Sequence, residues 1–383
     1  MSTAQRDLAG MGINLLAIAY EGHPSTRLRF EQYVPRLSED GTRVTTVLLP
    51  SGTRGQRQHV ERVSRAAADA DVVLVQRVLL GWLNDLLRAS RKPVVFDLDD
   101  AVQYIRPSQL ERTDQPRSLE DLSRVLYRRL LRGSKYHSSR RRHLHQMLSL
   151  CRAAIVGNRF LRDEIAGAAR CQLVVLPTSV PTQPGLVKDH RPHTPVTLGW
   201  VGLRDNLVHL RTLEPAFRAL SARFNGSAEL HVVTSEPYAS KFVPTRFTRW
   251  SLEREGDIVR DFDVGLMPLV DDRFSRGKSA FKAILCMSYG VPVVISPVGV
   301  NAELVRSGWN GFLASTLPEW ESALARLIED HELRRRLGRN AFETIERGFS
   351  TERAYPVLKS VIERAANGLL AGDVPAGQPS GAI

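Results

Sequence analysis

The chain has 383 residues, of which 43% are hydrophobic and 25% are charged; these values are typical of a globular protein and exclude wholesale disorder. At roughly 150 residues per domain, the length predicts two or three domains. The formal net charge is +12, and no stretch is apolar over the roughly 18 residues that a transmembrane helix needs. Residues 1–11 lack the pattern of a signal peptide, so we expect a short disordered lead there.

The first half of the sequence alternates between apolar runs of strand length and segments with helical periodicity. Residues 13–19 (INLLAIA) form an unbroken apolar run that ends before Gly22 and Pro24. Alternation of this kind predicts a mostly parallel sheet with helices on both faces. In chain order we expect strand 13–19, helix 26–37, strand 44–49, helix 56–68, strand 71–75, helix 79–89, strand 93–98, strand 153–156, helix 158–168 and strand 173–176.

A break in composition separates the two halves. Residues 177–195 contain five prolines and few apolar residues, which is typical of a domain boundary. After the break we expect strand 196–201, helix 207–224, strands 230–233 and 264–268, helix 278–289, strand 292–295, and helices 317–328, 332–346 and 351–366. This predicts an N-terminal domain (1–182), a linker (183–195), a C-terminal domain (196–350), a last helix (351–366) that packs back on the N-terminal domain, and a disordered tail (367–383).

The fold class follows from this pattern. We expect an α/β protein with two doubly wound, Rossmann-like domains that face each other across a cleft. Open parallel sheets bind ligands outside the carboxyl ends of their strands. The loops that follow the strands are therefore where functional residues should be sought.

The segment 271–301 (DDRFSRGKSAFKAILCMSYGVPVVISPVGVN) carries the strongest signal. We expect Ser275 to Ser279 to stand at a helix N-terminus, where free backbone N–H groups and the helix dipole attract anions. Lys278 and Lys282 are four residues apart and would share one helix face. The loop at Gly299 would face the same end of the sheet. The segment predicts a diphosphate site; the alternative is a capped helix with two solvated lysines.

At this segment the sequence resembles the retaining GT-B glycosyltransferases, a family 4-like group also called glycosyl transferases group 1. The resemblance rests on Lys282, Met287, Gly290, Val291, Pro292, Val293, Val294, Val298, Gly299, Glu303, Leu304, Val305, Gly308, Asn310, Gly311 and Phe312. It implies a GT-B architecture and metal-independent transfer of a sugar from a nucleoside diphosphate to an acceptor, with retention of anomeric configuration. It also implies that the second domain binds the donor, that the first binds the acceptor, and that no cofactor is needed.

The sequence departs from the family pattern at two glutamates. By alignment they fall on Gly277 and Leu285, so the usual ribose contact is unassigned. Arg204 is one position away from the family's arginine. The resemblance therefore implies that lysines meet the phosphate charge, with arginines assisting. The donor site would comprise Arg204, Arg276, Gly277, Lys278, Ser279, Lys282 and Gly299. Two alternatives remain: a degenerate GT-B fold that acts as a binding or scaffold protein, and a nucleotide-sugar epimerase.

Polar residues follow three strands of the first domain. The loop 21–29 offers His23, Ser25, Thr26 and Arg27 near a helix N-terminus, where a phosphate could bind. Alternatively, Ser25 or Thr26 caps this helix. Arg77 and Asn158 follow two other strands, and with the loop residues they complete the predicted acceptor site.

Three carboxylates, those of Asp97, Asp99 and Asp100, lie at the C-terminal end of the strand expected at 93–98. Because like charges repel, such a cluster is costly unless it is used or paired. We expect Asp99 or Asp100 to bind an acceptor hydroxyl or help remove its proton. Together with Lys282 they are the predicted catalytic residues. The alternative is helix capping and pairing with Arg77 or another base.

Eleven basic residues and no acidic residue lie between Leu122 and Arg162. Two amphipathic helices with arginine-rich faces are expected there. Three interpretations compete: a solvated face, a surface for anionic membranes or lipid-phosphate acceptors, and a nucleic-acid site, which the sparse aromatic residues disfavour. The predicted membrane or lipid-phosphate face comprises Arg124, Arg128, Arg129, Arg132, Lys135, Arg140, Arg141 and Arg142.

The expected partners are a nucleotide sugar, a glycan, lipid-linked or small-molecule acceptor, and an anionic membrane surface, with no nucleic acid. We expect a cytoplasmic protein, peripheral on the inner face of the membrane. Cys151, Cys171 and Cys286 have no metal or redox spacing, which predicts reduced and mostly buried thiols and no metal site.

Overall fold

The computed structural model describes residues 12–50, 56–104 and 138–369. Within these ranges the chain forms two compact units. The first contains residues 12–103, 138–177 and 354–369, and the second is built mainly from residues 178–353. No helix in the described part of the chain combines the length and apolar character needed to cross a bilayer.

The first unit contains a six-stranded parallel sheet in the order β2-β1-β3-β4-β5-β6. The strands are β1 (Asn14–Tyr20), β2 (Arg43–Leu49), β3 (Val72–Gln76), β4 (Val94–Leu98), β5 (Ala153–Val156) and β6 (Gln172–Val175). In register, Leu15 lies beside both Val44 and Val72. Every residue of β3, β4 and β5 is buried, which is why these strands read as continuous apolar runs.

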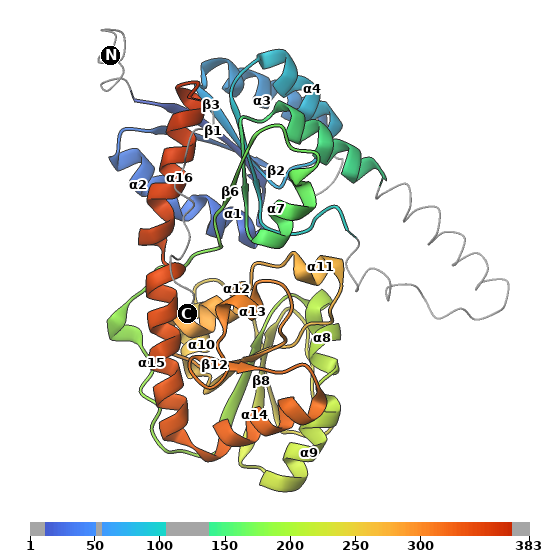
Figure 1. Ribbon diagram of the computed structural model, residues 1–383, viewed down its shortest axis with the longest axis vertical. Coiled ribbons are helices and arrows are strands. Elements are labelled where there is room, and N and C mark those ends of the chain that lie inside the picture. The colour runs from blue at the N-terminus through green and yellow to red at the C-terminus, as the bar shows by residue number, and fades with distance from the viewer. Residues whose placement is uncertain (1–11, 51–55, 105–137, 370–383) are drawn as a thin grey trace, which may run out of the picture. The chain divides into compact units, whose positions relative to one another are not determined.

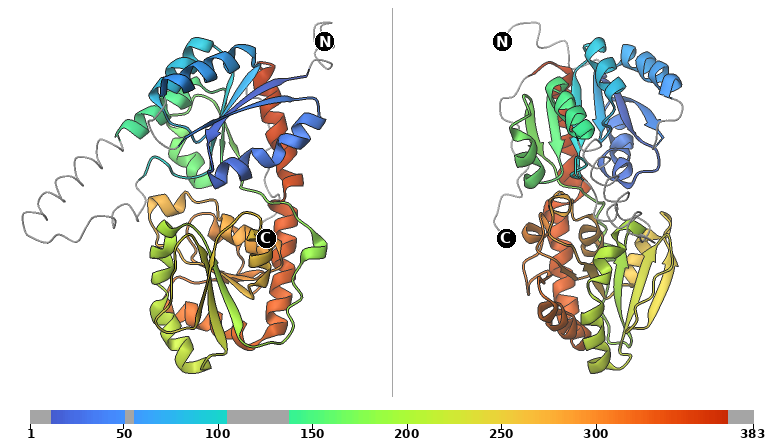
Figure 2. Two further views of the ribbon diagram at one scale, coloured as in Figure 1. Left: turned by 180° about the vertical axis from the view of Figure 1, so that it is seen from behind. Right: turned by 90° about the vertical axis from the view of Figure 1, so that its right-hand side faces the viewer.

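Helices cover both faces of this sheet (Figure 1). Those of the first unit are α1 (Pro24–Arg29), η3 (Glu31–Tyr33), α2 (Val34–Glu39), α3 (Gln56–Asp69), α4 (Gly81–Ser90), a helix at 138–150, α7 (Arg159–Ala166) and, from Ala354 onward, α16 (Thr351–Ala366). Tyr355 and Leu358 of α16 join a core cluster with Leu15, Leu74 and Val95. Figure 2 shows α3 and α4 on the opposite side of the sheet from α16. The end of the chain thus completes the core of its first unit.

The second unit contains another six-stranded parallel sheet, in the order β12-β11-β10-β7-β8-β9. This is the strand order of a Rossmann fold, with β7 as its first strand. The strands are β7 (Val196–Val201), β8 (Ala228–Thr234), β9 (Thr245–Arg249), β10 (Val264–Met267), β11 (Val293–Ile295) and β12 (Gly311–Leu313).

Two apolar clusters pack on the two faces of the second sheet. Alternate residues of β7 contribute to each: Leu198 and Trp200 to one cluster, and Val201 to the other, as the two-residue period of a strand requires. The short helices of this unit are η4 (Pro184–Leu186), η5 (Arg204–Asn206), α8 (Leu207–Arg211), α10 (Glu255–Asp261), α11 (Arg273–Arg276) and α13 (Asn301–Leu304), and the longer ones are α9 (Glu214–Phe224), α12 (Phe281–Ser288), α14 (Leu317–Glu329) and α15 (His331–Gly348).

The predicted fold class, two doubly wound parallel sheets, is confirmed. Three predicted helices are divided or begin more than two residues from the expected position. The helix expected at 26–37 is divided into α1, η3 and α2, and that at 207–224 is divided into α8 and α9, with Pro215 in the first turn of α9. The helix expected at 278–289 begins at Phe281. Strands β9 and β12 and helices α10, α11 and α13 were not predicted.

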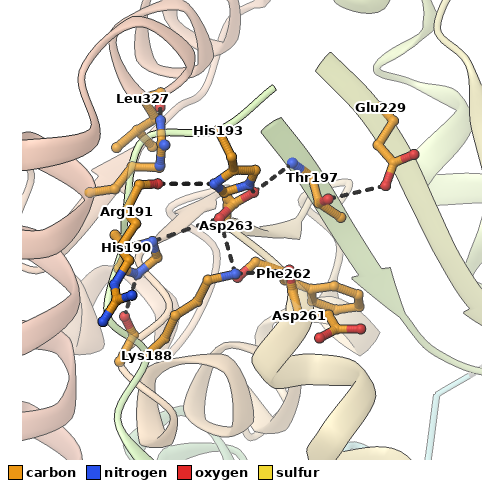
Figure 3. A network of polar contacts seen from close by, with 12 residues as sticks. Lys188, His190, Arg191, His193, Thr197, Glu229, Asp261, Phe262, Asp263 and Leu327 are labelled. Atoms are coloured by element: carbon orange, nitrogen blue, oxygen red, sulfur yellow. Dashed lines mark hydrogen bonds and ion pairs between the residues drawn. The ribbon is translucent and has the colours of Figure 1, made fainter. Parts of the chain in front are cut away.

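The proline-rich segment expected to be a linker belongs to the second unit, where it contacts buried Asp263 (Figure 3). Lys188 Nζ lies 3.0 Å and His193 Nε2 2.8 Å from this carboxylate, and the backbone N–H of Thr197 donates to it at 2.8 Å. Burial opposes ionisation of Asp263, but the His190 imidazole, the charge of Lys188 and the Thr197 N–H outweigh it and lower its pKa. One carboxylate therefore fastens the segment to β7 and β10.

Replacing this carboxylate tests its contribution. We expect Asp263→Asn to lower the free energy of unfolding by about 3 kcal/mol at pH 7, because Lys188 loses its charge partner and one acceptor oxygen becomes an NH2 group that faces other donors. The pKa of Asp263 is depressed in the folded state, so its stabilisation is complete above the unfolded value of about 3.9 and is lost as the pH falls below it. Urea unfolding at pH 7 and pH 3 measures both effects. Asp261→Asn, at an exposed neighbour, is the control, and equal stability of wild type and Asp263→Asn at pH 7 would contradict the assignment.

Candidate functional site

Sheet topology marks one ligand-binding position in each unit. In an open parallel sheet, ligands bind outside the carboxyl ends of the strands where the strand order reverses. In the first sheet this point lies between β1 and β3, and in the second between β7 and β10. The loops after these four strands carry most of the residues predicted for acceptor and donor.

Lys282, in the first turn of α12, reaches the loop after β7. Its Nζ lies 4.2 Å from the ring centroid of Trp200, which is buried. A Cβ on Gly202 would stand 2.4 Å from this Nζ, so the glycine leaves room for the ammonium group. Burial and the nearby charge of Lys278 lower the pKa of Lys282 well below its ordinary value. An anion placed here would relieve this destabilisation of the charge.

Lys278 lies before α12 and not on it, which corrects the predicted arrangement of the two lysines on one helix face. Residues 277–280 form a loop after α11, and Ala280 has a left-handed backbone (φ 52°) as the residue before the helix. Lys278 Nζ donates to Asn206 Oδ1 at 3.2 Å and lies 4.8 Å from the Phe274 ring centroid. A non-glycine residue in this conformation is strained, and such strain is often found at functional sites.

His209 of α8 is a further member of the site that the sequence did not indicate. Its Nδ1 accepts the backbone N–H of Val270 at 3.2 Å, which places the proton of the neutral ring on Nε2. Burial, together with the charges of Lys278 and Lys282, lowers the pKa of His209 to about 3. At neutral pH, His209 is therefore an uncharged N–H donor beside two lysines.

The two arginines predicted to assist already have acidic partners. Arg276 Nε and Nη2 donate to Asp271 at 2.6 and 2.9 Å, and Arg204 Nη1 donates to Glu236 at 2.5 Å. Both pairs are exposed to solvent.

Gly299 has a positive φ of 58°, and a Cβ there would stand 2.4 Å from the carbonyl oxygen of Arg276. A side chain at Gly299 would force these two loops apart. Ser275 is fully buried, and its backbone N–H donates to Asp272 Oδ1 at 2.7 Å, which caps α11. Ser279 lies in the loop between α11 and α12.

The positions aligned with the two family glutamates carry no polar side chain. Gly277 follows α11. Leu285 lies on α12, is buried, and packs in the apolar cluster with Ile284 and Met287. No carboxylate at either position can bind a ribose.

In the first unit, Arg29 and Asp97 form a buried ion pair that links three elements. Arg29 Nη2 lies 2.5 Å from Asp97 Oδ1, and Nε lies 3.1 Å from Oδ2. The third nitrogen, Nη1, donates to the carbonyl of Leu176 at 2.6 Å. Helix α1, strand β4 and the end of β6 are joined by this one guanidinium. Asp97 is thus consumed by pairing, as the alternative interpretation of the carboxylate cluster anticipated.

Arg77 serves the other two carboxylates. It has a positive φ of 59° and is buried. Its Nη1 lies 3.2 Å from Asp100 Oδ2, 3.6 Å from Asp99 Oδ1 and 3.0 Å from the Ser25 hydroxyl oxygen. Three predicted residues therefore meet at one nitrogen, in addition to Arg77 itself. Thr26 contributes to the same region through its hydroxyl, which donates to the Tyr20 carbonyl at 2.9 Å.

Asp99 lies beside Arg77 and Gln76. It is buried, and Gln76 Nε2 donates to its Oδ1 at 3.4 Å. Burial raises the pKa of Asp99 to about 6; the charge of Arg77 opposes the rise, and Asp100 and Asp97 add to it. A carboxyl that titrates near neutral pH can both accept and return a proton, which suits the predicted catalytic role.

Three predicted acceptor-site residues have local structural roles or positions. His23 caps α1, since its Nδ1 accepts the backbone N–H of Ser25 at 3.2 Å, so the cap is neither Ser25 nor Thr26. Asn158 Oδ1 caps α7 by accepting the N–H of Leu161 at 2.8 Å. Arg27 lies in the last turn of α1.

Most of the predicted basic face lies outside the described residues, namely Arg124, Arg128, Arg129, Arg132 and Lys135. Arg140, Arg141 and Arg142 belong to the helix at 138–150, where Arg141 and Arg142 are exposed. Leu144, Met147 and Leu148 of this helix are buried, which confirms the amphipathic pattern predicted for its second half. Within the described ranges, no three His, Cys, Asp or Glu side chains are grouped so as to hold a metal ion.

Residues 195–330 match the family model of glycosyl transferases group 1. The match covers the second sheet from β7 to β12, together with His209, Lys278 and Lys282. No curated protein sequence matches the chain.

Solved structures show the same fold over nearly the whole chain. HepE of Anabaena, solved with UDP and glucose, is 16% identical and has a TM-score of 0.61, with 92% of this chain and 99% of that chain covered. Sucrose-phosphate synthase of Thermosynechococcus elongatus is 15% identical with a TM-score of 0.66, and 93% and 100% are covered. The lipopolysaccharide outer core galactosyltransferase WaaB, in its apo form, is 12% identical with a TM-score of 0.56, and 94% and 100% are covered. The architecture is GT-B.

Substitution of Asp99 should reveal the cost of its burial. The pKa of Asp99 is raised in the folded state, so the stability that its neutral form contributes is complete below about pH 3.9 and is lost as the pH rises through about 6. We expect Asp99→Asn to exceed wild type in free energy of unfolding by on the order of 2 kcal/mol at pH 8, with little difference at pH 4.

The contrasting control is Asp97→Asn, which breaks the buried pair with Arg29 and should lose about 3 kcal/mol at pH 8. Chemical denaturation at both pH values measures the two variants. A loss of stability for Asp99→Asn at pH 8 would show that Asp99 is a paired structural carboxylate.

Proposed function

We propose that the protein is a metal-independent, retaining glycosyltransferase, family 4-like, that transfers a sugar from a nucleoside diphosphate to an acceptor. The observation that carries the proposal is the group of Lys278, Lys282 and His209 at the switch point of the second sheet. Two ammonium groups and a neutral N–H donor match the charge and hydrogen-bonding needs of a diphosphate. The family match to residues 195–330 supports the same assignment.

In this proposal the second unit binds the donor, and its lysines stabilise the leaving diphosphate as negative charge develops on it. Lys282 is held against Trp200 at 4.2 Å and needs little reorganisation when the charge appears. Same-face attack assisted by the leaving phosphate would retain the anomeric configuration. UDP is the first nucleotide to test, because HepE was solved with UDP and glucose.

The first unit would bind the acceptor, whether a glycan, a lipid-linked glycan or a small molecule. Arg77 and Ser25 would orient it, and Asp99, with a pKa of about 6, would accept the proton of the attacking hydroxyl. The basic residues near 124–142 would hold an anionic membrane surface or a lipid phosphate. In this proposal the protein works at the inner face of a membrane and needs no cofactor.

Nucleotide binding tests the donor site. We expect one of UDP, GDP, ADP, TDP or CDP to raise the melting temperature without added metal; a ligand at about 100 times its dissociation constant adds roughly 2.7 kcal/mol of stability. Lys282→Met should abolish this shift and lower sugar transfer or donor hydrolysis about 100-fold. Lys241→Met, at an exposed lysine, is the matched control. Unchanged binding and turnover in Lys282→Met would remove the lysine from the mechanism.

Proton linkage gives a second test of the same site. The pKa of Lys282 is lowered in the free protein, and a bound diphosphate should raise it, so binding should take up protons. Affinity should then fall as the pH rises. Calorimetry in two buffers of different ionisation enthalpy measures the uptake. We expect uptake in wild type and its loss in Lys282→Met; a binding enthalpy independent of buffer in wild type would contradict a depressed Lys282 pKa.

A second candidate function is a binding protein on a degenerate GT-B fold. The observation that favours it is the buried, apolar Leu285 at the position of a family glutamate. In that case no nucleotide would shift the melting temperature, and no transfer or hydrolysis would be seen. If a nucleotide sugar is instead isomerised without an acceptor, product analysis would identify the protein as an epimerase.

A further inference from the structure

The amino edge of the first sheet holds a pair of cysteines that the proposed glycosyl transfer does not use. Cys151 lies two residues before β5, and Cys171 lies immediately before β6. These strands pair in parallel with Ala153 beside Gln172. The crossover through α7 therefore brings together two residues that are 20 positions apart in the sequence. Their Sγ atoms lie 3.3 Å apart.

The two thiols have unequal surroundings. Cys151 is buried, while Cys171 is partly exposed. The hydrogen bond from the Cys151 thiol lowers the pKa of Cys171, and the same contact, with burial, raises the pKa of Cys151. Cys171 is thus the accessible and more readily ionised thiol, and Cys151 lies behind it within contact distance. Thiolate character and exposure together decide which cysteine reacts first.

A cavity of about 520 Å³ opens onto this pair. Its lining includes both cysteines and five cationic residues, and no acidic residue. Asp85, outside the lining, pairs with one of the five, Arg88, at 3.3 Å. The cationic residues are Arg88, Arg91, Lys92, Arg152 and Arg170. A concave site lined by charge of one sign raises the local concentration of ligands of the opposite sign.

Cys286 provides an internal comparison. It is buried in the core of the second unit, packs against Gly265 of β10, and does not line this cavity. Burial raises the pKa of Cys286 to about 12. Cys286 is therefore a buried thiol of the kind that the sequence predicted, whereas Cys171 is partly exposed.

We infer that this cavity is a thiol-modification site at which a small anionic disulfide oxidises Cys151 and Cys171 to an intramolecular disulfide. The Cys171 thiolate attacks one sulfur of the reagent, which breaks the reagent's S–S bond and releases one thiolate. Cys151 then gives up its proton and attacks Cys171 Sγ, which breaks the mixed disulfide and releases the second thiolate. The protein loses two hydrogen atoms, and the reagent gains both as two thiols.

The test uses the full chain and dithiobis(nitrobenzoate), an aromatic disulfide with two carboxylates. Wild type should release two equivalents of the coloured thiol per equivalent of reagent consumed, and its intact mass should fall by two hydrogen atoms. Cys151→Ala should release one equivalent and retain a mass adduct on Cys171. Cys171→Ser should react far more slowly, and Cys286→Ala should behave as wild type. A stable adduct on wild type, or two unreacted thiols, would overturn the proposal.

Electrostatic attraction is tested separately with a neutral reagent, dithiodipyridine. The double variant Arg152→Gln and Arg170→Gln should slow the anionic reagent about tenfold and leave the neutral one unchanged. High salt should act in the same way on wild type. Equal sensitivity of both reagents would show that the cationic lining does not recruit the oxidant. The wild-type mass measurement needs no variant, so it decides the disulfide even if a substitution impairs folding.

Discussion

Both units depend on a single constraint, which is that all paired strands within each sheet run in the same direction. Because the strands are parallel, the chain must return from the carboxyl end of one strand to the amino end of the next. It does so through a helix or a long loop. Residues that follow strands then lie together at the carboxyl ends of the strands, and residues that precede strands lie together at the amino ends. The carboxylates at the end of β4, and Lys278 and Lys282 near the end of β7, lie at the carboxyl ends. Cys151 and Cys171 lie at the amino ends.

Asp97 and Asp99 are both buried, but their negative charges are paired with arginines in different ways. Asp97 meets two nitrogens of one guanidinium at 2.5 to 3.2 Å, and that guanidinium has no second carboxylate within bonding distance among the described contacts. Asp99 lies 3.6 Å from an arginine nitrogen that also contacts Asp100 and Ser25. Short, two-point pairing offsets the cost of removing a charge from water, whereas a longer, shared contact does not. The first carboxylate is therefore stabilised in its charged form, whereas burial raises the pKa of the second.

The sequence revealed those features that depend on local pattern. Buried parallel strands read as apolar runs, and the Asp97 to Asp100 cluster and Lys282 stood out by residue type and position. Strand β9 was missed because Thr245–Arg249 has a single apolar residue, Phe247, among polar and charged ones, and β12 because it has only three residues. The start of α12 depends on the left-handed backbone of Ala280, for which alanine gives no signal. His209 acquires its role only when two lysines distant in sequence are brought beside it, and no local pattern records that.

The discontinuous make-up of the first unit has a consequence for the order of folding. Its sheet is complete by β6, yet Tyr355, Leu358 and Ile362 of α16 supply part of its core. During synthesis from the N-terminus, the apolar face that α16 covers is made long before α16 itself emerges. The second unit, whose sheet and helices are nearly contiguous in the chain, can close before the first. The part of the protein that is synthesised first therefore finishes folding last. Until α16 packs on it, the apolar face of its sheet is exposed, and exposed apolar surface of this kind is what chaperones bind.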